Sequence, residues 1–284
     1  MGMIEAAYQL RSSADFYVAS ESLSAAPIPM DIFIRGGTIM FKTIPGITAN
    51  TSAEELATNM ARTAFYTIRD VYRQPTTISA CRMANMDNMA TKASTLARLI
   101  RAHMDTEWPI LKDLGHAAVL QHYEMDGDLE ITDADEYLDL YHFASLMQQR
   151  SGHEEIRMAA TELMAAVDEY CVFKDKSSGP AEYKGKQYTW DHENSHGVSI
   201  FFPSPSSYRT FYTVAWLDFA AGTNWHGGAL GATDAPTGTI EWGPMLAQLV
   251  QKVNPGAPDN PDPPKLMSPL VVLSQVYLPM VLRQ

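Results

Sequence analysis

The sequence is poor in cysteine, in positive charge and in long apolar runs, and each shortage excludes a class of protein. Two cysteines, Cys81 and Cys171, allow at most one disulfide, and two buried free thiols are the expected state. The 21 Lys and Arg residues are outnumbered by 33 Asp and Glu residues, which gives a net charge of -12. Nucleic acids and anionic membranes attract clustered cations, so we expect neither as a partner. No apolar run is long enough to cross a bilayer.

The N-terminus also lacks the basic region and apolar run of a signal peptide. If translation starts upstream of Met1, this shortage says nothing about export. A signal encoded upstream would place the protein in the cell envelope or outside the cell, so the sequence leaves the compartment open.

The first 22 residues organise the rest of the sequence. Ile4, Ala7, Tyr8 and Leu10 are spaced like the apolar face of a helix, and 16–19 is a short apolar run typical of a buried strand. A helix followed by a strand is half of a βαβ unit, and no strand precedes this helix.

The same residues resemble the clostripain family of cysteine peptidases. In that family the nucleophile stands in a run Asp-x-Cys-Leu-Met-Gly, and a Tyr-x-Leu and a strand ending Val-Ala-Ser-Glu follow it. This chain has Met1-Gly2-Met3-Ile4-Glu5, then Tyr8-Gln9-Leu10, then Val18-Ala19-Ser20-Glu21. The match begins just after the position of the cysteine. The resemblance therefore implies that the catalytic Cys and His are encoded upstream and that Met1 is an internal methionine.

Later segments follow the order of the same family. The strand 77–81, the run 138–143 and above all Gly197-Val198-Ser199-Ile200-Phe201-Phe202-Pro203 are similar to family segments, and an aromatic helix is expected over 208–219. The resemblance implies an α/β, caspase-like fold, with a mostly parallel sheet flanked by helices and its N-terminal strands missing. Residues 1–231 would be the C-terminal part of the peptidase domain, and 232–284 a proline-rich linker and C-terminal extension.

Local patterns predict most of the remaining elements. Ser52 and Glu55 form a capping box for a helix that runs to about Arg73. Apolar spacing predicts further helices over 83–104, 108–123, 154–169 and 242–253. Proline and glycine residues predict a loop over 22–50, with short strands near 32–34 and 38–41. A strand begins at 170, residues 174–186 read as a loop or hairpin, and 270–282 could pair with a sheet edge.

His192-Glu193-Asn194-Ser195-His196 matches the H-E-x-x-H pattern of zinc peptidases. The pattern binds zinc only on a helix, which holds both imidazoles on one face. Asn194 and Ser195 are poor helix formers and Gly197 opens a strand, so the pattern predicts the approach to that strand. A zinc metallohydrolase is kept as an alternative.

A cysteine nucleophile within the chain is a second alternative. A reactive thiolate needs a partly exposed, electropositive setting with a neighbouring His. Cys81 lies in a predicted buried strand and Cys171 at a junction of helix and strand, so both are expected in the core. A third alternative is a noncatalytic peptide-binding or assembly domain, in which the open edge of an incomplete sheet pairs with another strand.

The resemblance also implies a substrate. The family cleaves peptides and proteins after Arg or Lys, and the strand after the nucleophile helix helps to line the pocket for that side chain. Ser20 and Glu21 match the family's Ser-Glu and are the substrate-binding candidates, with no catalytic residue in the chain. The run 22–27 departs from the family pattern. The expected partners are a substrate and the missing N-terminal part of the same domain.

Residues 124–139 form the most acidic window of the chain. Family members can require calcium, but the window lacks the glycine and the final Glu of an EF-hand in the right places, and no other cofactor is expected. The simpler interpretation is that Thr132 caps a helix whose first turn holds Asp133, Asp135 and Glu136.

Overall fold

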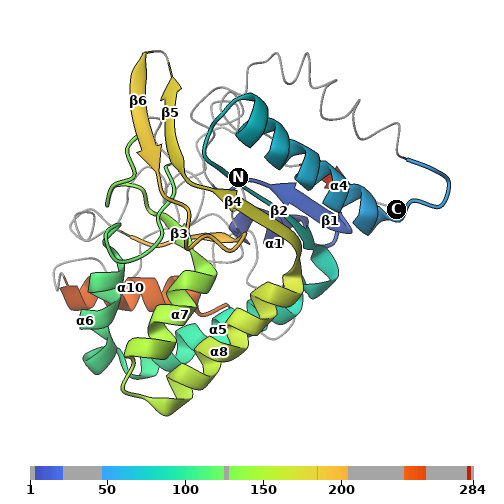
Figure 1. Cartoon of the computed structure of the whole chain (residues 1–284). Helices are drawn as coiled ribbons and strands as arrows, with labels where there is room; N and C mark the ends of the chain where they lie inside the picture. The colour runs from blue at the N-terminus through green and yellow to red at the C-terminus, as the bar shows by residue number, and fades with distance from the viewer. Residues whose placement is uncertain are drawn as a thin grey trace, which may run out of the picture.

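A computed structural model describes residues 4–21, 47–124, 128–183, 185–203, 240–253 and 280–282. Its main sheet has four strands: β1 (Phe16–Ala19), β2 (Thr76–Arg82), β4 (Cys171–Ser177) and β8 (Met280–Leu282), in the order β4-β2-β1-β8 (Figure 1). Two further strands, β3 (Tyr137–Asp139) and β7 (Ser199–Phe201), are hydrogen-bonded to each other in a separate two-stranded sheet. The fold is thus a mixture of helices and small sheets, as the α/β prediction requires.

The predicted mostly parallel sheet is not confirmed. β2 runs antiparallel to β1 and to β4, and β1 runs antiparallel to β8. Hydrophobic pattern identifies a strand, but the direction in which the chain re-enters the sheet is set by its connections and packing, which the pattern does not contain. The predicted pairing of the C-terminal segment with a sheet edge is confirmed for β8, since β8 pairs with β1.

Helix α4 (Ala53–Tyr66) packs on one face of the main sheet (Figure 1). Side chains alternate between the two faces of a strand, so Phe16, Ile78 and Ala80 face α4 and contact its Ala57 and Phe65. The capping box predicted at the start of α4 is present: the Glu55 backbone N–H donates to Ser52 Oγ, and the Ser52 N–H donates to the Glu55 carboxylate.

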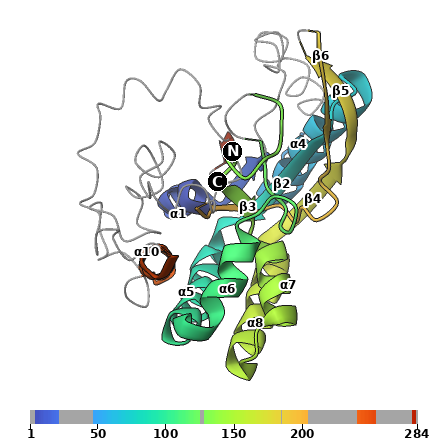
Figure 2. The same cartoon turned by 90° about the vertical axis from the view of Figure 1, so that its left-hand side faces the viewer.

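The other face of the sheet lies on the main core, which the remaining helices build (Figure 2). These helices are α1 (Ile4–Leu10), α5 (Met86–Ala102), α6 (Met104–Leu114), α7 (Leu140–Arg150), α8 (Glu154–Tyr170) and α10 (Trp242–Val253). Met86, Met89, Leu96 and Ile100 are buried along α5, as their helical spacing predicts. α10 packs in the same core through Trp242, whose ring meets Phe143 edge to face.

Several predicted bounds are corrected by the structure. The helix predicted over 108–123 is α6, which begins at Met104 and ends at Leu114. The helix predicted after Thr132 is wrong: 133–134 form a turn, because the Asp135 carboxylate accepts from the Thr132 N–H and β3 begins at Tyr137. The predicted elements over 32–34, 38–41 and 208–219 lie outside the described residues.

The two cysteines are buried free thiols, as expected. Cys81 and Cys171 face each other across β2 and β4, with 3.0 Å between their Sγ atoms. Gly197 lies against them with φ +95°, and an added Cβ would come within 3.1 Å of Ser79 and 3.2 Å of Cys171 Sγ. Only glycine fits this approach to β7, because the backbone is left-handed and the space is filled.

After β4 the chain forms a hairpin, β5 (Gly179–Tyr183) and β6 (Lys186–Trp190), that projects from the body in Figure 1. Among the described helices, none combines the length and apolar character that a bilayer crossing needs.

Candidate functional site

Glu21, one of the two substrate-binding candidates, lies at the end of β1 with 1% of its surface exposed. Its backbone N–H donates to Thr77 Oγ1 at 3.1 Å. Its carboxyl group lies against Tyr123, whose hydroxyl is 2.8 Å from Oε1, and against Ser195, whose hydroxyl donates to Oε2. Asp139, at the end of β3, completes this group, with Oδ2 3.0 Å from the Tyr123 hydroxyl. We call Glu21, Tyr123, Asp139 and Ser195 the sheet-side cluster.

Two carboxyl groups in one buried cluster cannot both be charged without a large cost. Burial and the neighbouring charge of Asp139 raise the pKa of Glu21 well above its ordinary value. Of the two carboxyl groups, Glu21 is therefore the one on which a proton is favoured. The Tyr123 hydroxyl has one proton for three neighbouring oxygen atoms, the Ser195 hydroxyl gives a second to Glu21 Oε2, and a proton on Glu21 is the third, so the network can be satisfied internally.

Asp139 is the charged member of the pair. Burial alone would raise the pKa of Asp139. The hydrogen bond and the nearby imidazole of His196, together with the backbone N–H of His142, hold this pKa below its ordinary value. Asp139 caps helix α7 by accepting from the His142 N–H at 2.6 Å, and it also accepts from the His196 N–H at 2.7 Å. The imidazole Nδ1 of His196 lies 3.4 Å from Asp139. Asp139 thus joins β3, α7 and the approach to β7.

Ser20, the other candidate, precedes Glu21 and is partly exposed, with its Oγ 3.4 Å from Thr77 Oγ1. A pocket of roughly 1070 Å³ lies elsewhere, beside the first turn of α4 and the start of β1, where Arg62, Arg82 and Glu54 are among its lining residues. The pocket includes neither Ser20 nor Glu21. Their role in binding substrate stays a prediction.

The H-E-x-x-H run is not a zinc motif in this fold. Residues 192–196 form a turn before β7 and no helix, because the Ser195 N–H donates to the His192 carbonyl and Gly197 follows in a left-handed conformation. His192 is fully buried, and burial lowers its pKa to about 4. His196 stacks on Tyr141 with ring centroids 4.1 Å apart. The zinc metallohydrolase alternative is therefore not favoured.

Neither cysteine is placed as a nucleophile. Cys81 and Cys171 are 1% and 7% exposed, and each has the other as its nearest sulfur. Burial and the hydrogen bond that Cys171 donates to Cys81 raise the pKa of Cys171 well above its ordinary value, so Cys171 is a thiol at neutral pH. A nucleophilic thiolate needs the opposite environment.

The described part of the acidic window does not form a calcium loop. Asp133 accepts from the Ala117 N–H and from His116, Asp135 from the Thr132 N–H, and Asp128 from the Glu130 N–H. These carboxylates are used in local hydrogen bonds and point to different neighbours. Within the described ranges, the group of His, Cys, Asp and Glu side chains that could hold an ion lies elsewhere, at His103, His153 and Glu155.

Solved structures give this arrangement its context. A cysteine protease of B. fragilis is 17% identical to this chain, with a TM-score of 0.50 over 85% of each chain. The chain shares the fold of a cysteine protease. The likeness to the clostripain family seen in the sequence is therefore confirmed for the fold.

Two other solved structures carry the family name in their descriptions. An inactive zymogen C11 protease from Parabacteroides distasonis is 18% identical, with a TM-score of 0.49 over 74% of this chain and 53% of its own. A clostripain from Bacteroides thetaiotaomicron in complex with a peptide inhibitor is 14% identical, with a TM-score of 0.46 over 76% of this chain and 77% of its own. This chain thus spans about half the length of the zymogen. No family model and no curated protein matches the sequence.

Sequence reasoning found Glu21 but missed the residues that surround it. Tyr123, Asp139 and Ser195 come from three distant segments, and only folding brings them to Glu21. One signal was available. Asp139 precedes the apolar helix pattern of α7, which is the position of an N-cap residue.

Proposed function

We propose that this chain is part of a clostripain-like cysteine endopeptidase, namely the portion that follows the nucleophile in the family's sequence order. The fold shared with the B. fragilis protease over 85% of both chains is the observation that carries the proposal. In this proposal the catalytic Cys and His are not residues of this chain. The burial of Cys81 and Cys171 supports that part, because both sulfur atoms are closed off from a substrate.

We further propose that the substrate is a peptide or protein cleaved after a basic residue. The family resemblance of Ser20 and Glu21 supports this, together with the net charge of -12, which attracts cationic peptides. The sheet-side cluster holds one negative charge, on Asp139, and an Arg or Lys side chain would be attracted to it. Because the Glu21 carboxyl group is buried, it must exchange its contacts with Tyr123 or Ser195 before it can meet a basic side chain directly.

The first experiment asks whether this chain is catalytic by itself. The purified chain is incubated with Arg and Lys peptide substrates under reducing conditions, with and without Ca²⁺, since family members can require calcium. We expect no thiol-dependent cleavage. Cleavage that is blocked by a thiol alkylating agent and lost in Cys81→Ser or Cys171→Ser would contradict the proposal that the nucleophile lies outside this chain.

The second experiment tests substrate binding. Fluorescent peptides ending in Arg, Lys or Gln are titrated into the chain and binding is followed by anisotropy. We expect the Arg and Lys peptides to bind at least about tenfold more tightly than the Gln peptide, and Asp139→Asn, which removes the negative charge of the sheet-side cluster, to remove most of this preference. Ser195→Ala is the matched control, because it disturbs the same cluster without changing its carboxyl groups. Equal binding of all three peptides would overturn the predicted specificity.

A further inference from the structure

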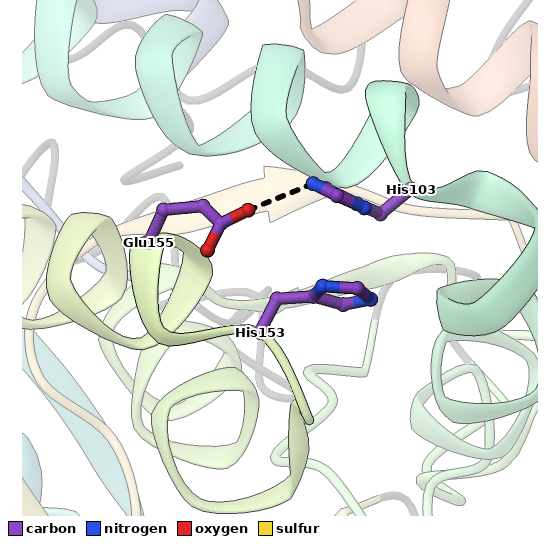
Figure 3. A group of neighbouring side chains, drawn as sticks. All are labelled: His103, His153 and Glu155. Carbon is purple, nitrogen blue, oxygen red and sulfur yellow. Dashed lines mark ion pairs between the residues drawn. The ribbon is translucent and has the colours of Figure 1, made fainter.

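Two histidines and a glutamate meet at the end of the helices remote from the sheet. His103 joins α5 to α6, His153 precedes the first turn of α8, and Glu155 lies in that turn. Figure 3 shows the two imidazole rings one above the other, with the Glu155 carboxylate beside them. α5 extends about 25 Å along its axis from the sheet side to His103, at 1.5 Å per residue. This group, called the helix-side cluster, is therefore separate from the sheet-side cluster.

The three side chains already bring metal-binding atoms close together. One ligand atom from each of His103, His153 and Glu155 lies within 4.8 Å of the others. His103 Nε2 is 2.8 Å from Glu155 Oε1, and the two imidazole centroids are 3.8 Å apart. The side chains of His103, His153 and Glu155 are 32%, 29% and 48% exposed, so an ion from solution can reach them.

The hydrogen bonds around His153 leave one of its nitrogen atoms available. Thr106 Oγ1 lies 2.9 Å from the His103 carbonyl and 2.9 Å from His153 Nε2. A hydroxyl has one proton, and Thr106 donates it to the carbonyl, which can only accept. Towards His153 the hydroxyl must therefore accept, so Nε2 carries the proton in the neutral ring. The lone pair on Nδ1 is then the one that a metal ion would take.

Glu107 places a buried carboxylate close to His153. Its Oε1 accepts from Ser151 at 3.1 Å and lies 3.8 Å from His153 Nε2, which is too far for a hydrogen bond. Its Oε2 has no hydrogen-bond partner among the described residues. Metal-ligating histidines typically donate the proton of their second nitrogen to an oxygen acceptor, which orients the ring. Thr106 is that acceptor for His153, and the Glu107 carboxylate acts on the ring through its charge.

We propose that the helix-side cluster is a binding site for a divalent transition-metal ion, Zn²⁺ in the first place. His103 Nε2, His153 Nδ1 and a Glu155 carboxylate oxygen would be the protein ligands, and water would take the fourth position. Imidazole nitrogen and carboxylate oxygen are ordinary zinc ligands, whereas calcium and magnesium take oxygen. Thr106 and Glu107 act as positioning residues through His153. The proposal does not depend on the peptidase function.

Binding the ion requires the side chains to rearrange. Ligand atoms at about 2.0–2.1 Å from a tetrahedral zinc are about 3.3 Å from one another. The pair formed by His103 and Glu155 must open from 2.8 Å, and the two stacked imidazole rings, with centroids 3.8 Å apart, must turn so that both lone pairs point at the ion. Both histidines lie at helix ends that backbone hydrogen bonds hold: the Glu107 N–H donates to the His103 carbonyl, and the Arg157 N–H donates to the His153 carbonyl. The ion would fix the α5–α6 corner to the start of α8.

The test uses the whole chain, stripped of metal with a chelator. Zn²⁺ is titrated calorimetrically at pH 7.5, and Co²⁺ is added as a spectroscopic probe whose visible absorption reports its coordination. We expect one Zn²⁺ per chain, and at least about tenfold weaker binding in His103→Gln, His153→Gln and Glu155→Gln. Glu154→Gln is the matched control, because Glu154 is exposed in the same helical turn and lies outside the cluster. Circular dichroism confirms that each variant is folded.

Further variants distinguish this site from others. His192→Gln and His196→Gln should leave Zn²⁺ binding unchanged, and Glu107→Gln should weaken it by a smaller factor while keeping the stoichiometry. The proposal is overturned if no stoichiometric Zn²⁺ binds, or if binding persists at full strength in the double variant His103→Gln, His153→Gln. If Zn²⁺ binding is lost only in the His192 and His196 variants, the ion binds at the H-E-x-x-H run, and the proposal for the helix-side cluster is equally rejected.

Discussion

The two polar clusters of this chain handle charge in opposite ways. The sheet-side cluster is closed: Glu21 and Asp139 are 1% and 0% exposed and lie among hydroxyl and backbone N–H donors. The helix-side cluster is open: the Glu155 side chain is 48% exposed, and the imidazoles beside it are about one-third exposed. Buried carboxyl groups must be protonated or hydrogen-bonded within the protein, whereas exposed ones can rely on water or on an ion.

The difference separates a stabilising network from a binding site. In the sheet-side cluster the hydrogen bonds of Asp139 join it to other parts of the fold, so its removal should affect folding first. In the helix-side cluster the carboxylate of Glu155 touches one histidine and solvent, so its removal should affect ligand binding first. Stability measurements on single variants can therefore test the assignment of each cluster.

The largest effect is expected for Asp139→Ala. The substitution removes the N-cap of α7 and leaves the partly buried N–H groups of His142 and His196 without their acceptor. Unpaired donors and a lost cap should together lower the free energy of unfolding by about 3–5 kcal/mol. Urea denaturation measures this, with Asp139→Asn as the control that keeps one acceptor oxygen. A loss below about 1 kcal/mol for Asp139→Ala would show that the cluster is not a stabilising network.

A somewhat smaller, pH-dependent effect is expected for His192, which is buried beside the same cluster. Its Nδ1 lies 3.2 Å from the Ser177 carbonyl, and its Nε2 has no partner among the described residues. Burial lowers its pKa to about 4 in the folded chain, against about 6.5 when unfolded. The unfolded state therefore binds more protons between these values, and the stabilisation from the neutral ring is lost as pH falls from about 6.5 towards 4.

The variant His192→Gln has no such proton to bind. Between pH 7.5 and 4.5 the wild-type chain should lose about 2–3 kcal/mol more stability than this variant. The measurement is urea denaturation at several pH values, and the readout is the slope with pH, not the absolute stability. Parallel profiles for wild type and His192→Gln would contradict the burial argument.

Local sequence patterns predicted the helices well because their signals lie within a few residues. The capping box at Ser52 and Glu55 is present, and α10 has the bounds that its apolar spacing predicts. Such patterns could not predict strand direction, since β1 and β2 are joined through a long intervening segment. The turn at 133–134 was missed because a helix cap and a side-chain turn use the same residue types.

The candidate sites differ in how much the sequence could predict. Glu21 was found through family resemblance, but its burial and its partners depend on long-range packing with Tyr123 and Ser195. The helix-side cluster was not predicted, because His103 and His153 are fifty positions apart and each is an unremarkable histidine in its own segment. The pattern that did attract attention, at 192–196, failed because it requires a helix that Gly197 and the turn do not allow.

The smallest effect is expected at the open cluster. Without metal, Glu155→Gln loses an exposed pair with His103, and exposed pairs contribute little to stability. In the presence of a chelator we expect its free energy of unfolding to match that of Glu154→Gln. With Zn²⁺ in excess, Glu154→Gln should gain stability and Glu155→Gln should gain much less, because a ligand that binds the folded state alone stabilises it. A large loss of stability for Glu155→Gln in the chelator would instead indicate that the helix-side cluster is itself a stabilising network. The contrast between the two regions would then disappear.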